Sequence, residues 1–202
     1  DQDARHAFPP FFLSAPRAPS HHAFDASPRW WAERVADANE DPYEVVAPFH
    51  FELDAQRLGD DVVLSGTMTG ALELECGRCV ARYRQPLRET FSLVLEAARG
   101  RVPLDPEGSE ALRVDGMCLG DEIEVGWYRG SEIRLDTWFA EIIALAMPVQ
   151  PLCSDECLGL CPKCGADRNE GACRCSVDEA RPDSPFAKLG ALKNGLQRSR
   201  GD

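Results

Sequence analysis

The chain has 202 residues, of which 44% are hydrophobic, enough for one main core with a small appended module. Its 22 Lys and Arg against 34 Asp and Glu give a net charge of −12. This charge argues against a surface that wraps nucleic acid, because phosphate contacts need a positive face. No stretch approaches the roughly 18 apolar residues that cross a bilayer, so we expect no membrane span.

The first part of the chain, residues 1–26, contains several prolines and no sustained hydrophobic period. We expect it to form a flexible N-terminal arm. Ser27 and Pro28 then have the typical order of a helix N-cap and first helical position. A short helix carrying Trp30 and Trp31 is therefore predicted to follow.

Two amphipathic runs predict a β-hairpin. Alternate residues of 62–75 are apolar, and residues 83–95 repeat this period-2 pattern. The segment Cys76-Gly77-Arg78-Cys79 joins the two runs, so a pair of cysteines is expected at the tip of an antiparallel hairpin. The residues predicted to face inward on the first run are Val62, Leu64, Met68, Leu72 and Leu74.

Arginines on the second run share the face opposite its apolar side chains and could form a basic stripe. This stripe and the basic end of the chain are candidate contacts for a partner or for RNA. The alternative is that these side chains are simply solvated. The candidate contact residues are Arg78, Arg82, Arg84, Arg88, Lys188 and Lys193.

Residues 99–120 are rich in glycine, proline and charge, and we expect them to form a loop, followed by a short strand over 121–127. Asp136 can cap a helix that runs to about Met147. Residues 27–150 are therefore predicted to form the core domain.

The cysteine-rich residues 151–176 follow the core and have little apolar content, whereas 177–202 predict a last helix and a tail. The predicted fold is α+β, with an antiparallel sheet and hairpin core, flanking helices and a C-terminal cysteine-rich zinc ribbon.

Eight of the nine cysteines fall into close pairs. An odd total and two CxxC pairs, without a visible secretion signal, point to metal rather than disulfides and to the reducing cytoplasm. Two residues between cysteines let both sulfurs reach one tetrahedral zinc, and Gly165 permits the turn after one pair. The candidate ligands are Cys76, Cys79, Cys153, Cys157, Cys161, Cys164, Cys173 and Cys175.

Two divisions of these ligands are possible, with one or two structural zinc ions. The preferred division pairs Cys161 and Cys164 with Cys173 and Cys175, and places the hairpin pair with Cys153 and Cys157. The rival division puts 153, 157, 161 and 164 around one ion. Four-ligand closure is the rule for structural zinc and favours the division into two sites.

Redox and catalytic functions have less support in the sequence than metal binding. Thiol–disulfide exchange needs a cysteine at a helix N-terminus after a strand, whereas the hairpin pair joins two strands. Cys118 stands alone and is expected to be a small buried hydrophobic residue. No phosphate-binding, metalloprotease or serine-hydrolase motif occurs. We therefore expect neither enzymatic activity nor a small-molecule substrate.

Four stretches resemble the YceD family of bacterial large-ribosomal-RNA accumulation proteins: residues 66–79, EIIALAMPVQPLC (141–153), GLCPKCGADRN and PFAKLGALK. The resemblance implies a role in the synthesis, processing or stability of large-subunit ribosomal RNA. Large-subunit components, the RNA or basic ribosomal proteins, would then be the partners. The alternatives are a zinc-stabilised interaction module of another pathway and a thiol oxidoreductase.

Overall fold

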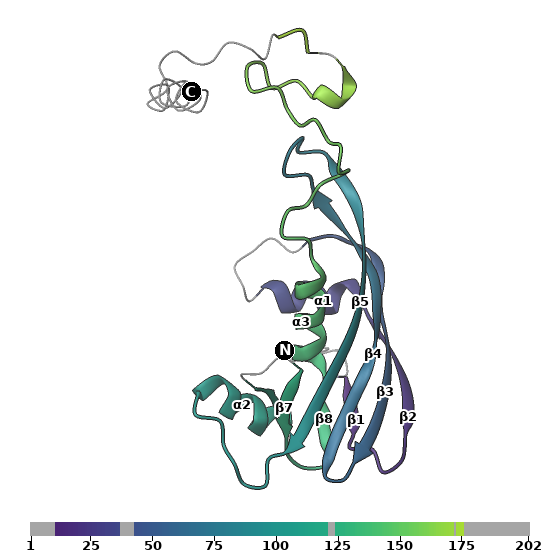
Figure 1. Ribbon diagram of the computed structural model, residues 1–202, viewed down its shortest axis with the longest axis vertical. Helices are drawn as coiled ribbons and strands as arrows, with labels where there is room; N and C mark the ends of the chain where they lie inside the picture. Colours follow the sequence, from purple (N-terminus) through teal and green to yellow (C-terminus); the bar gives the residue numbers. More distant parts are fainter. Residues whose placement is uncertain (1–10, 37–42, 121–123, 172, 176–202) are drawn as a thin grey trace, which may run out of the picture. The chain divides into compact units, whose positions relative to one another are not determined.

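The computed structural model describes residues 11–36, 43–120, 124–171 and 173–175 (Figure 1). The chain divides into two compact units, Asp1–Asp155 and Glu156–Asp202. The predicted C-terminal helix and tail, with Lys188 and Lys193, lie outside the described residues, as does the start of the predicted strand over 121–127.

The first unit is built on a six-stranded sheet with strand order β2-β3-β4-β5-β7-β6. All neighbouring pairs are antiparallel except β5 and β7, which are parallel. A separate two-stranded sheet pairs β1 (Phe12–Ser14) with β8 (Glu132–Arg134). The described residues also contain three α-helices, so the predicted α+β class is confirmed. The strands of the main sheet are β2 (Ser20–Ala26), β3 (Val45–Leu58), β4 (Asp61–Glu75), β5 (Arg82–Ala97), β6 (Met117–Leu119) and β7 (Val125–Tyr128).

The predicted hairpin is confirmed as β4 and β5. Their register runs without a break from Val62 opposite Leu95 to Glu75 opposite Arg82. Every residue predicted to face inward on β4 is at most 4% exposed. Because side chains of a strand alternate between faces, this register buries one apolar face and leaves the other to solvent.

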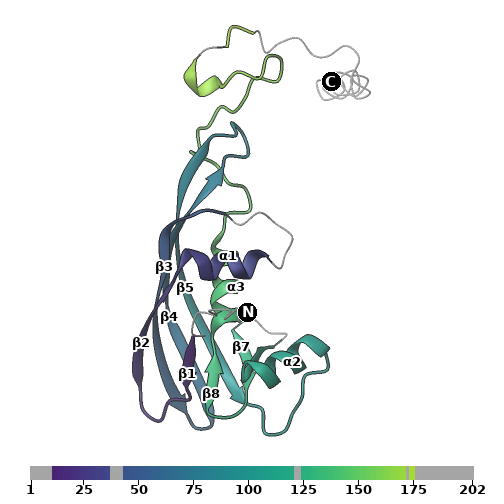
Figure 2. The same cartoon turned by 180° about the vertical axis from the view of Figure 1, so that it is seen from behind.

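Helices α1 (Pro28–Ala36) and α3 (Asp136–Ala146) lie along the same face of the sheet (Figures 1 and 2). The Phe139 ring stacks on Phe51 with ring centroids 3.9 Å apart, and Trp31 meets Phe49 edge to face. The predicted cap of α1 is confirmed, since the backbone N–H of Trp30 donates to Ser27 Oγ at 3.2 Å. None of the helices in the described part of the chain is long and apolar enough to span a membrane.

The predicted cap of α3 is wrong. Leu135 occupies the N-cap position, and Asp136 is instead buried at 3% exposure. Its carboxylate accepts hydrogen bonds from Phe11 N at 3.0 Å and Trp30 Nε1 at 3.1 Å, and lies 3.3 Å from the Arg34 guanidinium. The donors lie more than one hundred residues away in the sequence. The residues around Asp136 therefore could not predict that its carboxylate is buried and hydrogen-bonded rather than used as a cap.

The prediction of a flexible arm over 1–26 is also corrected for its described part, because β1 and β2 lie within it. Strand β2 pairs with β3 along its whole length, from Ser20 opposite Ala55 to Ala26 opposite Phe49. Its inward-facing positions include polar residues as well as Phe24, so the alternation is weak in the sequence. The pairing partner, rather than the local pattern, makes it a strand.

The predicted loop over 99–120 contains helix α2 (Pro106–Val114) and strand β6. The Asp105 carboxylate caps α2 by accepting a 2.5 Å hydrogen bond from the backbone N–H of Gly108. Leu112 packs with Ala98 and Cys118 in a small second core. Helix α2 is short and buries a single leucine, so this stretch of sequence shows almost no helical periodicity among its glycines and charged residues. For this reason the helix was not predicted.

The described residues of the second unit contain one short 3₁₀ helix, η1 (Arg168–Glu170), and an isolated antiparallel bridge between Leu160 and Asp167. Cys157 and Cys161 are buried, whereas Leu158 and Leu160 are exposed. The described part of this unit has no cluster of buried aliphatic or aromatic side chains. Something other than an apolar core must therefore stabilise the described part of the second unit.

Candidate metal centres

The turn Cys76–Ala81, here called the first knuckle, closes the β4–β5 hairpin. Cys76 N donates to Ala81 O and Val80 N donates to Cys76 O, both at 2.9 Å. Val80 has a φ of 62°, a left-handed conformation that β-branched residues rarely adopt. The knuckle holds the Cys76 and Cys79 sulfurs on one side of a tight turn.

The turn Cys161–Ala166, the second knuckle, repeats this geometry. Cys161 N donates to Ala166 O and Gly165 N donates to Cys161 O, both at 2.8 Å. Gly165 has a φ of 73°, as expected of the glycine after this cysteine pair. The antiparallel pair Leu160 and Asp167 flanks this knuckle at the positions that Glu75 and Arg82 occupy around the first.

Eight sulfur atoms form two groups of four, and within each group all atoms lie within 4.8 Å of one another. Two of these separations, Cys79 to Cys153 and Cys164 to Cys173, are 3.7 Å. Zinc–sulfur bonds of about 2.3 Å in a tetrahedron place the sulfurs about 3.8 Å apart, so the spacing fits such an ion. The groups are Cys76, Cys79, Cys153 and Cys157, and Cys161, Cys164, Cys173 and Cys175, which is the preferred division and not the rival one.

The first cysteine of each group has a lowered pKa, whereas in the second group the pKa of Cys175 is raised. Backbone N–H groups, foremost that of Cys153, lower the pKa of Cys76 to about 6. Those of Cys164 and Lys163 likewise lower the pKa of Cys161 to about 6. The neighbouring thiol of Cys164 raises the pKa of Cys175 to about 12. The backbone thus favours the first thiolate of each group, and in the second group a divalent cation would offset the repulsion that opposes the Cys175 thiolate.

Hydrogen bonds within the first unit hold the segment around Cys153 against the hairpin tip. Gly77 N donates to Pro151 O at 2.8 Å, and Arg78 Nη1 donates to Asp155 O at 3.3 Å. Arg78 was predicted as a partner contact, and the structure gives it this intramolecular role at an exposed position. The cysteine spacing alone does not indicate either contact.

Asn169, in the second unit, is a supporting residue that the sequence did not reveal. Its side-chain Nδ2 donates to Cys157 Sγ at 3.4 Å, while its Oδ1 accepts from Leu158 N at 2.8 Å. A hydrogen bond to sulfur stabilises a thiolate and orients it. No spacing rule links an asparagine to a cysteine twelve residues earlier.

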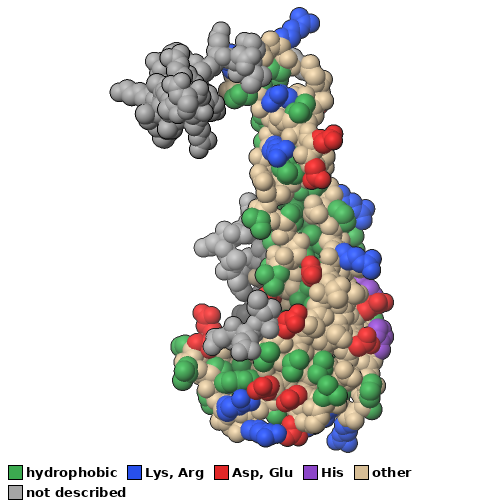
Figure 3. Space-filling model, viewed as in Figure 1, with side chains coloured by type: hydrophobic (Ala, Val, Ile, Leu, Met, Phe, Trp, Pro, Cys, Tyr) green, Lys and Arg blue, Asp and Glu red, His purple; other side chains and the backbone are tan. Residues whose placement is uncertain are grey.

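The predicted basic stripe lies on the solvent-facing side of β5, where Arg82, Arg84 and Arg88 are exposed. Arg82 is 3.3 Å from the Glu73 carboxylate, and Arg84 lies opposite Glu73 in the register. Basic and acidic side chains are interspersed on the face shown in Figure 3. This mixture weakens the positive field that a phosphate backbone would need.

Cys118 is only 5% exposed and belongs to neither group of four. It packs against Ala98 and Leu112, as its isolation in the sequence predicts. Burial raises the pKa of its thiol. Cys118 is therefore the least reactive kind of cysteine, a small apolar side chain.

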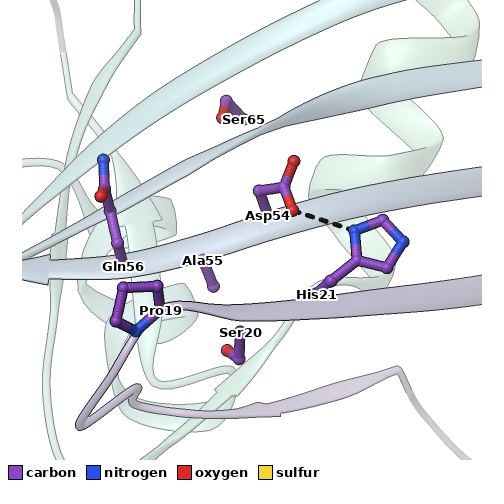
Figure 4. Close-up of a pocket in the computed structure, with 7 residues that line it drawn as sticks. All are labelled: Pro19, Ser20, His21, Asp54, Ala55, Gln56 and Ser65. Carbon is purple, nitrogen blue, oxygen red and sulfur yellow. Dashed lines mark hydrogen bonds and ion pairs between the residues drawn. The ribbon is translucent and has the colours of Figure 1, made fainter.

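A shallow hollow of about 360 Å³ lies on the outer face of β2–β4 (Figure 4). His21 Nδ1 lies 2.9 Å from Asp54 Oδ1, and both side chains are more than half exposed. Ser65 lies opposite Asp54 on the next strand, so the aspartate rather than the histidine is in the middle. A nucleophilic triad needs the histidine between the serine and the carboxylate, and this order does not provide one.

The fold and the cysteine groups define a mixed α+β protein with two candidate metal centres of four thiols each. The chain belongs to the YceD family, whose model is described as Large ribosomal RNA subunit accumulation protein YceD and matches residues 64–193. The match includes the β4–β5 hairpin from Leu64 onward and all eight paired cysteines. The predicted resemblance is confirmed.

Individual relatives are distant. A protein of Arabidopsis thaliana named Large ribosomal RNA subunit accumulation protein YCED homolog 1, chloroplastic, is 24% identical over 166 residues, covering 76% of this chain and 51% of the relative. An uncharacterized protein of Mycobacterium leprae is 24% identical over 119 residues, covering 59% and 48%. One of Mycobacterium tuberculosis is 26% identical over 118 residues, covering 56% and 48%. The chain spans about half the length of these relatives, and no solved structure matches it significantly.

Proposed function

We propose that this protein is a non-catalytic accessory factor in the accumulation of large-subunit ribosomal RNA, and that it holds two structural zinc ions. The family supports the first part, and the two groups of four cysteines support the second. Tetrahedral sets of four thiolates are typical of zinc or iron–sulfur centres, and separate four-sulfur sites within turns favour zinc. The second unit would then be a zinc ribbon.

The observation that supports a structural rather than a catalytic role for the zinc ions is that each group has four cysteines. Catalytic zinc keeps one coordination position open for water or substrate, whereas four protein thiolates close the shell. A redox role fits less well, because both knuckles are turns flanked by antiparallel pairs rather than starts of helices. The metal would supply cohesion rather than chemistry.

Basic ribosomal proteins are the proposed partners within the large subunit. The net charge of −12 and the interspersed charges around the arginine stripe suit a basic protein better than a phosphate backbone. The site of action would be the compartment where ribosomes assemble, the cytoplasm in a bacterium.

Zinc content tests the metal half of this proposal. Elemental analysis of natively purified protein should return two zinc ions per chain, one for each group of four. Cys118→Ser, the matched control, should keep both ions because Cys118 is outside the groups. A well-folded protein without metal, whose thiols form stable disulfides, would refute the metal half of the proposal.

Ribosomal RNA levels test the functional half. Deleting the gene in its source organism should lower the ratio of mature large-subunit to small-subunit RNA, and the wild-type gene should restore it. Cys79→Ser should restore it less well than Cys118→Ser. Affinity purification should enrich large-subunit components. An unchanged ratio without such enrichment at low or high salt would favour an interaction module of another pathway.

A further inference from the structure

Among the residues that the structure describes, β5 has one open edge in the first unit. β5 pairs with β4 along its length, but on the other side it pairs with β7 only from Val94 to Ala97. Over residues 82–93, no strand among the described residues occupies that side. An open edge presents backbone N–H and C=O groups that can pair with another chain.

The direction of the backbone groups follows from one hydrogen bond. Val94 N donates to Glu124 O at 2.8 Å, and therefore away from β4. Bonding direction alternates along an antiparallel strand, so Thr90 and Ser92 also point their N–H and C=O groups to the open side. Pro86 has the same parity, where its missing N–H leaves the β4–β5 ladder intact.

A groove of about 600 Å³ lies between this edge and α3, which runs beside β5 in Figure 1. Its floor is apolar and includes Phe91, Trp138, Ile142 and Leu145. Leu145 is 76% exposed although it lies on a helix that packs against the core. An extended chain on the β5 edge could bury its side chains on this floor.

The rim of the groove is acidic. Glu89, Glu124 and Glu141 come from β5, the start of β7 and α3, and among the described residues they are the only ionisable ones that line the groove. Burial raises the pKa of Glu141, so a cation placed beside it would stabilise its charged form. The rim therefore selects for positive charge.

A second copy of this chain is a poor occupant. Edge-to-edge pairing of two copies would bring two acidic rims together, and each chain already has a net charge of −12. Nucleic acid would bring its phosphates to the same carboxylates. A basic polypeptide satisfies the open backbone groups, the apolar floor and the acidic rim together.

We propose that this groove binds an extended peptide segment in which basic residues alternate with apolar ones, and that the segment adds a strand to the edge of β5. None of the described lining residues is a cysteine, so the proposal is independent of zinc and goes beyond a role in ribosomal RNA accumulation. Apolar side chains of the peptide would lie on the floor, and its Lys or Arg side chains would meet the three glutamates.

A fluorescein-labelled peptide of about ten residues, with Lys and Val alternating, is the probe, and fluorescence anisotropy on the full chain measures its binding. Thr90→Pro removes one open N–H without touching the β4–β5 ladder and should weaken binding about tenfold. Glu141→Gln should also weaken it, whereas Glu132→Gln, an exposed acidic residue outside the groove, should not.

A peptide methylated on alternate backbone nitrogens provides a readout that needs no variant, and it should bind as weakly as Thr90→Pro binds the parent peptide. Equal binding of a Glu–Val peptide, or equal binding by all the variants, would overturn the proposal. So would absence of binding to the wild-type chain at about 1 mM peptide, a concentration at which even weak binding would be detected. A wild-type dimer that Thr90→Pro dissociates would overturn it in favour of self-association.

Discussion

The two cysteine knuckles have the same backbone hydrogen bonds but different surroundings. Each first cysteine donates to the carbonyl five residues later, and each residue after the second cysteine donates back to the first. That residue is Val80 in the first knuckle and Gly165 in the second, both with positive φ. The turn is thus set by its own backbone bonds, whatever lies on either side.

The surroundings decide how much each knuckle needs a metal. The first closes a hairpin whose strands bury residues such as Leu64, Met68 and Leu93. The second lies in a unit whose described residues bury cysteines but no large apolar side chains. Zinc in a small thiolate site contributes on the order of 10–16 kcal/mol, comparable to the stability of a whole domain. This contribution should be essential in the second unit and local in the first.

Breaking the second site should have the largest effect. Cys164→Ser, or zinc removal by a chelator, should abolish the order of residues 156–175, because the binding energy of about 10–16 kcal/mol is the folding energy there. Backbone amide NMR should show these signals collapse to unfolded positions while those of the sheet persist. Cys118→Ser should leave both sets in place. Equal damage from the two serine variants would contradict the assignment.

Breaking the first site should have a smaller and local effect. Cys79→Ser should reduce the zinc content by one ion and increase amide hydrogen exchange at residues 76–80. The sheet should survive, because the β4–β5 register and its apolar face do not depend on the knuckle. Hydrogen exchange by mass spectrometry separates the two regions. Loss of protection across β3 and β4 would show that the sheet depends on the metal.

Gly165→Val tests the glycine of the second knuckle. The added Cβ meets nothing within 4 Å, so its cost is conformational and amounts to about 1–2 kcal/mol for a left-handed residue. Zinc affinity at the second site should fall roughly tenfold in a competition titration with a chelator. Gly165→Asn should cost less, because asparagine tolerates this conformation. Equal losses of zinc affinity in the two variants would show that the left-handed backbone conformation is not the cause.

Val80→Gly is the reciprocal change in the first knuckle. Relief of the left-handed valine should outweigh the greater chain entropy of glycine and stabilise the chain by about 0.5–1 kcal/mol. Thermal unfolding of the zinc-loaded protein should show a rise of a few degrees in Tm. A fall in Tm would mean that the exposed Val80 side chain makes a stabilising contact.

The smallest effect concerns Cys118, which lies outside both knuckles. Its buried thiol has a raised pKa, so little thiolate forms near neutral pH. Iodoacetamide should label it slowly in the native chain and rapidly after denaturation, as followed by peptide mass spectrometry. Rapid labelling in the native state would indicate that the small core around Leu112 opens readily.

Patterns that repeat locally were predictable from the sequence. The alternation in β4 and β5, the cap at Ser27 and the glycine after Cys164 each depend on neighbouring residues alone. The division of the cysteines could be narrowed to two choices, since the four-ligand rule limits how pairs combine. The positions of these elements along the chain therefore came out correctly.

Features that depend on distant partners were missed. Strand β2 alternates only weakly between polar and apolar residues and forms because it pairs with β3. Asp136 is buried because it accepts hydrogen bonds from donors more than one hundred residues away. Helix α2 combines a short length with a single buried leucine. The open edge of β5 is likewise a property of strand order, which no local window contains.

The buried Asp136 has a consequence for the order of folding. It joins Phe11, Trp30 and Arg34 to the start of α3, and β1 is completed only by β8. During translation, the N-terminal strand therefore lacks its partner until the chain has been made beyond residue 136. The β4–β5 hairpin, whose contacts are local, can form earlier, before Phe11 and β1 make their contacts with β8 and α3.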